Sequence, residues 1–128
     1  MELPALVTLV ALLEYMFFSY SVGMGRGKYD VPAPAVSGNE TWERLYRVQM
    51  NTLEQIVVFV PALWLFAWYV SPLYGALIGL GFIVGRPIYY MSYVSEPSKR
   101  TVGFLLGFLA TTILLLGGIG GVLYKLVS

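Results

Sequence analysis

The sequence of 128 residues contains neither cysteine nor histidine. Without cysteine, the protein can form no disulfide bond, and it can supply neither a thiolate nucleophile nor the ligands of an iron–sulfur cluster. Without histidine, it lacks the usual general base, the serine triad and the commonest zinc ligand. We therefore expect no protein-bound metal, and any reactive nucleophile must be supplied by a ligand.

Charged residues are scarce, at 12% of the chain, whereas hydrophobic residues make up 58%. This composition is too apolar for a soluble domain of this length, and the net charge of +1 gives no indication of a nucleic-acid partner. Four apolar segments are each long enough to cross a hydrocarbon core of about 30 Å, which needs about 20 helical residues. Strand-like alternation is absent. The sequence predicts an all-α integral membrane protein, one domain over residues 1–128, with helices at about 3–22, 42–70, 73–93 and 101–127.

The basic residues are distributed unevenly between the two ends of these segments. Those that flank the first and third connections are Arg26, Lys28, Arg44, Arg47, Lys99 and Arg100. The opposite side carries only Lys125, near the C-terminus. The positive-inside rule then places both termini outside and the two polar connections in the cytoplasm. A bacterial inner membrane, or the endoplasmic reticulum of a eukaryote, is the expected location.

Polar side chains occupy the first turns of the second apolar segment, between Glu43 and Glu54, immediately before the run from Gln55 to Trp64. Four of them have the three- and four-residue spacing of a single helical face: Arg44, Arg47, Asn51 and Glu54. Burying a charged group in hydrocarbon costs roughly 2.5–3.5 kcal/mol even on the lenient insertion scale. A purely structural span does not need such residues, so we expect a polar site at the membrane edge.

The third segment repeats this spacing with Arg86, Tyr89 and Tyr93, and Arg100 follows seven residues later. Two polar stripes at matching depth define a pocket for a small anionic ligand that also carries an amine. Arginine binds carboxylates in a bidentate manner, and glutamate accepts an ammonium group. In the structural alternative, the arginines are interfacial anchors, the tyrosines form an aromatic belt, and Glu54 and Arg86 form an ion pair.

A separate carboxylate, Glu14, lies within the first segment. It is either packed in a structural role or carries protons or cations. Small multidrug exporters also have four short helices and use a glutamate in the first one. A four-helix exporter that depends on Glu14 is therefore an alternative from another functional class.

The sequence resembles the MAPEG family, the membrane-associated proteins in eicosanoid and glutathione metabolism. The matching segments are Gly25–Tyr29, Ala33–Ala35, Glu43–Glu54 and Arg86–Tyr93, of which the E-R-x-x-R-x-Q-x-N-x-x-E block is the most specific. The similarity spans essentially the whole chain. It implies a homotrimer of four-helix subunits, with glutathione as co-substrate bound between adjacent subunits near the cytoplasmic face.

The resemblance also implies the roles of individual residues. The positions that match the family's glutathione-binding residues are Arg26, Arg47, Gln49, Asn51, Glu54, Arg86, Tyr89 and Tyr93. Arg100 matches the arginine proposed to face the glutathione sulfur and would be the catalytic residue. Gln55 replaces the tyrosine of the leukotriene-forming enzyme, and Gly27 replaces a second arginine. These two departures favour a general transferase over an eicosanoid-specific one.

These features together lead to a functional expectation. A membrane-bound glutathione transferase would ionise the thiol and direct it against lipophilic electrophiles in detoxification, with peroxidase activity on lipid hydroperoxides as a further reaction. A free thiol with a pKa near 8.5 is only a few per cent thiolate at about pH 7, and a guanidinium at Arg100 would lower that pKa. The alternatives are a non-catalytic, lipid-binding member of the family and the exporter.

Overall fold

The computed structural model describes all residues from 1 to 128 and consists of four long helices. These are α1 (Glu2–Lys28), α2 (Glu40–Tyr69), α3 (Pro72–Ser95) and α4 (Thr101–Val127), with a short 3-10 turn at Pro97–Lys99 before α4. All four are long and apolar enough to cross a membrane. The predicted all-helical fold class with four membrane helices is confirmed. The association into trimers remains a prediction.

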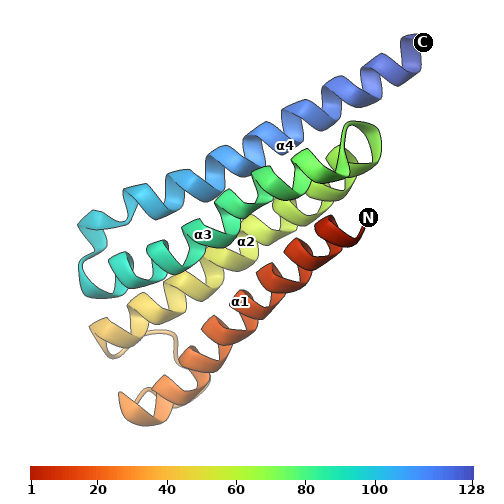
Figure 1. The fold of residues 1–128 in the computed structure, drawn as a ribbon. Helices are drawn as coiled ribbons and strands as arrows, with labels where there is room; N and C mark the ends of the chain where they lie inside the picture. The colour runs from red at the N-terminus through yellow and green to blue at the C-terminus, as the bar shows by residue number, and fades with distance from the viewer.

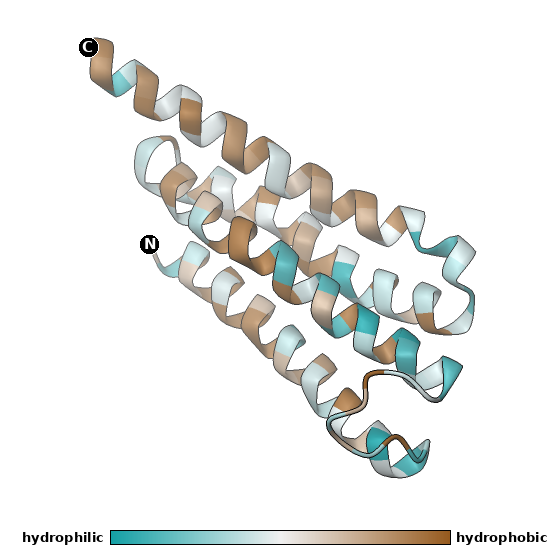
Figure 2. Cartoon of the chain, turned by 180° about the vertical axis from the view of Figure 1, so that it is seen from behind, coloured by the Kyte–Doolittle hydropathy of each residue, from teal (hydrophilic) through white to brown (hydrophobic).

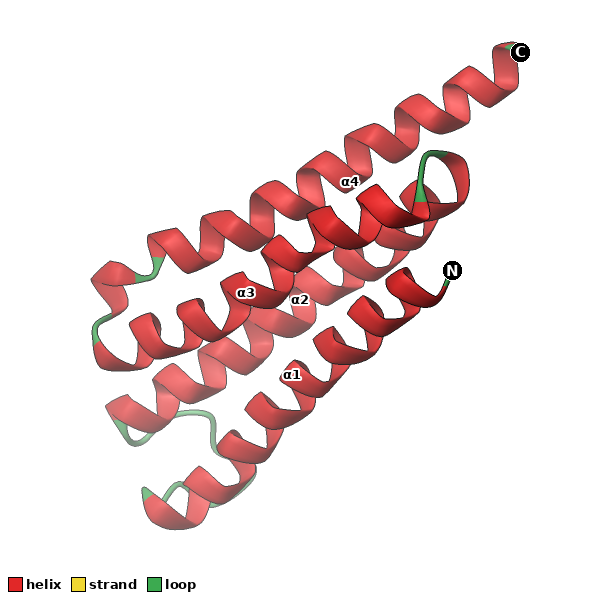
Figure 3. Ribbon diagram, in the orientation of Figure 1, coloured by secondary structure: helices red, strands yellow, loops and turns green.

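Consecutive helices run antiparallel, and α2 and α3 lie between α1 and α4 (Figures 1 and 3). Both termini and the tight α2–α3 turn lie at one end of the bundle, while the α1–α2 and α3–α4 connections lie at the other (Figure 1). Hydrophilic residues gather at this second end, whereas the remaining lengths of the helices are mainly hydrophobic (Figure 2). We call the second end the polar end. Its exposure to the cytoplasm remains a prediction.

The first helix is longer than predicted, because it continues from residue 22 to Lys28. Glycines at positions 23, 25 and 27 lower helix propensity, and for this reason a loop was expected there. Tertiary packing outweighs that preference, since Gly25 lies directly against Trp42, whose ring Nε1 donates a hydrogen bond to the Val22 carbonyl at 3.1 Å. The connection between α1 and α2 is therefore residues 29–39.

The start of α2 is set by a side-chain cap. Asn39 is the cap: its Oδ1 accepts a hydrogen bond from the Trp42 backbone N–H at 3.0 Å. An extended residue with a short polar side chain satisfies one of the N–H groups that a helix start leaves unpaired. Consequently α2 begins at Glu40, slightly earlier than predicted, and its polar face starts at the polar end.

Aromatic residues and glycines hold the bundle together. Phe59 of α2 stacks on Phe82 of α3, with ring centroids 4.1 Å apart, at the centre of the main apolar core. Between α3 and α4 the contact is closer, because Gly85 and Gly103 bring the two backbones together: a Cβ atom at Gly103 would lie 2.3 Å from the Tyr89 backbone nitrogen. Glycines permit this close approach of two helices, and it places the start of α4 beside the end of α3.

Candidate functional site

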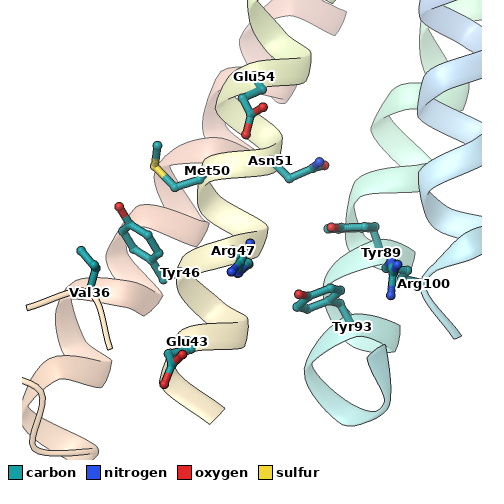
Figure 4. Close-up of a pocket in the computed structure, with 10 residues that line it drawn as sticks. All are labelled: Val36, Glu43, Tyr46, Arg47, Met50, Asn51, Glu54, Tyr89, Tyr93 and Arg100. Carbon is teal, nitrogen blue, oxygen red and sulfur yellow. The ribbon is translucent and has the colours of Figure 1, made fainter. Parts of the chain in front are cut away.

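A cleft of about 560 Å³ opens at the polar end, between α2 and the last turns of α3. Its lining residues are Val36, Glu43, Tyr46, Arg47, Met50, Asn51, Glu54, Tyr89, Tyr93 and Arg100. Six of the nine predicted site residues lie among them, namely Arg47, Asn51, Glu54, Tyr89, Tyr93 and Arg100. Figure 4 shows Arg47 and Asn51 extending from α2 toward the two tyrosines of α3. Residues of α2 and α3 that lie far apart in the sequence, such as Arg47 and Tyr89 at 42 positions, therefore face the same cleft.

The charged groups of α2 that line the cleft are not neutralised by neighbours. Arg47 and Glu54 are exposed and take part in none of the ion pairs or side-chain hydrogen bonds of the chain. The predicted alternative, a Glu54–Arg86 ion pair, is not formed. Arg47 lies four residues before Asn51 and Glu54 three residues after it, on the same helical face. This cation and this anion therefore remain available to a ligand that carries both a negative and a positive group.

Arg86 lies behind the cleft instead of lining it. Its side chain is fully buried, and Nη1 donates hydrogen bonds to Asn51 Oδ1 at 2.8 Å and to Thr52 Oγ1 at 3.2 Å. The guanidinium also packs over the Tyr89 ring, 4.5 Å from its centroid. Arg86 thus fixes the orientation of two lining residues, and its contribution to this cleft within one chain is through Asn51 and Tyr89.

The α3 side of the cleft ends in a stack of aromatic rings and a guanidinium. Tyr89 and Tyr93 are stacked with centroids 5.5 Å apart, and Arg100 lies over Tyr93 at 6.0 Å (Figure 4). Its Nη1 donates to the Pro97 carbonyl at 3.1 Å, which holds the side chain at the rim. The remaining donors of the guanidinium have no partner in the protein and are free to bind an anion.

A second hollow, of about 340 Å³, adjoins the cleft and shares Asn51, Tyr89 and Arg100 with it. It continues along the start of α4 to Thr101 and Phe104. Arg100 therefore stands between the charged cleft on α2 and a space that extends toward the apolar part of the bundle. A group bound beside Arg100 can be approached from both sides.

Two of the predicted site residues are engaged elsewhere in the chain. Arg26 donates from Nη1 to the carbonyls of Val31 and Ala35, and its guanidinium packs over Trp42. It thereby anchors the α1–α2 connection. Gln49 Nε2 donates to Ser19 Oγ of α1 at 3.1 Å.

The first member of the predicted stripe, Arg44, is also turned away from the cleft. It pairs with Glu40 at 2.8 Å and donates to the Val94 carbonyl. Helical spacing placed Arg44 on the same face as Arg47. Its long side chain nevertheless turns away from the cleft, because it contacts Glu40 and the end of α3.

Four lining residues were not predicted as part of the site: Val36, Glu43, Tyr46 and Met50. Three of them continue the three- and four-residue spacing of the α2 stripe, so the periodicity contained the signal, although Tyr46 and Met50 are less polar than their neighbours. Val36 comes from the α1–α2 connection, and no local pattern marks it. The loop reaches the cleft because Glu43 accepts a hydrogen bond from the Gly38 backbone N–H at 3.3 Å.

The fold and the site define a class: a multi-pass, four-helix membrane protein with unpaired cations and an unpaired carboxylate in a cleft at one end of the bundle. Comparison with known families identifies it further. The model of the MAPEG family matches residues 4–120, and the chain belongs to this family. The resemblance seen in the sequence is therefore confirmed.

Three relatives are similar to this chain over most of their own length. An uncharacterized protein of Synechocystis sp. is 45% identical over 123 residues, covering 96% of this chain and 90% of the relative. Microsomal glutathione S-transferase 2 of Homo sapiens is 37% identical over 120 residues, covering 92% and 81%. Leukotriene C4 synthase of Mus musculus is 33% identical over 98 residues, covering 77% and 65%. One of these three relatives is thus named as a glutathione S-transferase.

Proposed function

We propose that this protein is a membrane-bound glutathione transferase that ionises the thiol of glutathione for attack on lipophilic electrophiles. The observation that carries the proposal is the convergence of Arg47, Glu54 and Arg100 on one cleft, each with free charge. Kinship with microsomal glutathione S-transferase 2 supports the same conclusion.

In this proposal, several groups of glutathione have a partner of suitable charge or hydrogen-bonding capacity in the cleft. Glutathione carries two carboxylates, one ammonium group and one thiol, and the free guanidinium of Arg47 is suited to a carboxylate. Glu54 receives the ammonium group, while Asn51, oriented by Arg86, hydrogen-bonds the peptide part. The phenols of Tyr89 and Tyr93 supply further donors on the α3 side. This arrangement leaves the thiol end toward Arg100.

Arg100 provides the chemistry. An arginine guanidinium is a permanent cation, and such a cation beside a thiolate stabilises the ionised form of the sulfur. Lowering the thiol pKa by about two units, equivalent to about 2.7 kcal/mol, makes the thiolate the main form at neutral pH. The thiolate sulfur then forms a bond to an electrophilic carbon as the leaving group departs with the bonding electrons.

The electrophile enters from the membrane through the hollow that Arg100 shares with Phe104. With a lipid hydroperoxide, the sulfur attacks the O–O bond, an alcohol is released, and a second glutathione reduces the resulting sulfenic acid to a disulfide and water. Both reactions remove reactive lipophilic compounds, which is a detoxifying role.

The working unit in this proposal is a homotrimer whose sites lie between subunits. Arg26 and Gln49 contact other parts of their own chain and do not line its cleft; in this proposal they act at a neighbouring subunit's site, as the family resemblance implies. The polar end then faces the cytoplasm, where glutathione is available, in a bacterial inner membrane or in the endoplasmic reticulum. Both termini lie on the opposite side.

Two other functions are less well supported. A non-catalytic lipid-binding member of the family would not need free charges at Arg47, Glu54 and Arg100. A four-helix exporter that depends on Glu14 would leave the same cleft unexplained, since Glu14 lies on α1 and is not among the residues that line it.

A titration tests the proposal directly. Glutathione is added to the detergent-purified protein in a calorimeter, and the ultraviolet absorbance of the thiolate is recorded in parallel, followed by conjugation with a generic aryl halide. We expect saturable heat, a thiolate signal at neutral pH and release of halide. If neither heat nor absorbance changes, the proposal is wrong; binding without thiolate or conjugation would favour the non-catalytic alternative.

The substitution Glu54→Gln is expected to weaken glutathione binding about tenfold or more, because a hydrogen bond to a charged group is worth about 1.5–3 kcal/mol. Glu54 is exposed and unpaired, so the fold should be unaffected and the melting temperature unchanged. Calorimetric titration measures the affinity, and Glu40→Gln is the matched control, since Glu40 pairs with Arg44 outside the cleft. Equal affinity in Glu54→Gln and the unmodified protein would assign Glu54 another role.

A further inference from the structure

Glu14 is a carboxylate in the middle of α1 that the proposed chemistry does not use. It forms no ion pair and no side-chain hydrogen bond, and its Oε1 is buried without a partner. It borders an apolar groove between α1 and α3, together with Pro87 and Tyr90. A lone carboxylate at this depth needs a compensating group.

The register of α1 against α3 places Arg86 opposite this carboxylate. The two helices run in the same direction (Figure 1), and Phe18 stacks on Tyr90 with centroids 5.2 Å apart. Further toward the N-terminus, Val7 lies against Gly79, where a Cβ atom would be 3.0 Å from Val7 Cγ1. In both contacts, the residue of α3 follows the residue of α1 by the same number of positions in the sequence. Arg86 follows Glu14 by that number as well, so these two residues lie at the same level of the bundle, between the two contacts.

Arg86 has unused donors at this level. Its Nη1 serves Asn51 and Thr52, whereas Nε and Nη2 are buried without a hydrogen-bond partner. Glu14 and Arg86 lie at the same level of the bundle and can carry opposite charges, although their atoms do not form a direct ion pair. A buried cation without a counter-charge is strongly destabilising, and Glu14 is an unpaired carboxylate at the level of Arg86.

We propose that Glu14 is a positioning residue for the cleft: it compensates the charge of Arg86, keeps the Arg86 guanidinium on Asn51 Oδ1, and so holds the Asn51 amide in its ligand-binding orientation. Glu14 acts from α1 on a cleft built by α2 and α3, and it does not touch the ligand. The glutathione readout of this inference rests on the proposed function, whereas the pairing of Glu14 with Arg86 does not.

The test combines Glu14→Gln with Arg86→Lys in a double-mutant cycle on the full-length, detergent-purified protein. Glu14→Gln removes the charge at nearly constant shape, and we expect the dissociation constant for glutathione to rise about tenfold, within the range typical of coupled neighbours. The titration midpoint of the bound thiol should stay constant, because Arg100 is untouched. Once Arg86 is lysine, the same change should cost about twofold or less, since the guanidinium contact with Asn51 is already lost.

The matched control is Glu2→Gln, the same chemical change on the same helix at an exposed position, and it should leave affinity unchanged. A merely structural Glu14 would lower the melting temperature without changing the affinity of the folded protein. Unchanged affinity in Glu14→Gln, or an equal loss in the Arg86→Lys background, would overturn the inference.

Two further measurements keep the outcome decisive. If Glu14→Gln does not fold, Glu14→Asp retains the charge and should retain most of the affinity; a loss greater than about tenfold in that variant would contradict charge compensation. If the unmodified protein does not bind glutathione, the proposed function fails, and the cycle is then measured on melting temperatures. Non-additive effects on the melting temperature would support the pairing of Glu14 with Arg86, and additive effects would contradict it.

Discussion

Replacing Arg100 by alanine is expected to remove most of the thiolate of bound glutathione at pH 7 while leaving glutathione binding detectable. The guanidinium is the only cation at the α3–α4 rim of the cleft, and Arg47 remains on α2 to hold a carboxylate of the ligand. Without Arg100, the thiol pKa should return by about two units to near 8.5, so that the thiolate fraction at pH 7, and with it the rate of conjugation, falls about 25-fold. A pH titration of the thiolate absorbance measures the midpoint.

The sign of the pH dependence follows from this mechanism. A depressed thiol pKa means that the unmodified protein keeps its thiolate down to about pH 6.5, whereas Arg100→Ala should require alkaline pH to recover it. Arg44→Ala is the matched control, because Arg44 is also at the polar end but pairs with Glu40 outside the cleft. An unchanged midpoint in Arg100→Ala would transfer the role to another residue of the cleft.

Gly103→Ala is expected to have the largest effect on folding. The added Cβ atom would lie 2.3 Å from the backbone nitrogen of Tyr89 and 2.9 Å from the carbonyl oxygen of Gly85. Backbone atoms cannot turn aside as a flexible side chain can, so α3 and α4 must separate. Overpacking of this kind costs about 1–3 kcal/mol or more. We expect a clear fall in the melting temperature, measured by thermal unfolding of the detergent-purified protein.

The same substitution should also weaken glutathione binding, because Gly103 sets the distance between Tyr89 on α3 and Arg100 at the start of α4. Gly120→Ala is the matched control on the same helix, since a Cβ atom there would meet nothing within 4 Å. Alanine is favoured over glycine in helices by about 1 kcal/mol, so this variant should be as stable as the unmodified protein or slightly more so. Equal melting temperatures for the two variants would show that α3 and α4 tolerate separation at Gly103.

Features that depend on local spacing were predictable from the sequence. The lengths of the four apolar segments predicted the four helices, and the three- and four-residue spacing of Arg47, Asn51 and Glu54 predicted the polar face of α2, because helical periodicity is a property of consecutive residues. The end of α1 was not predictable in this way. Glycine propensity indicated a loop after residue 22, but the contact of Gly25 with Trp42 comes from a residue on the next helix.

The sequence by itself determined that the protein has four apolar spans, no cysteine or histidine chemistry of its own, and a polar face on α2 matched by one on α3. Only the tertiary structure decided that Arg86 turns inward to Asn51 and that Arg26 and Arg44 turn away from the cleft. The reason is physical. Backbone periodicity fixes the face of a helix from which a side chain starts, but the group that a long charged side chain reaches depends on which neighbouring helix supplies a partner.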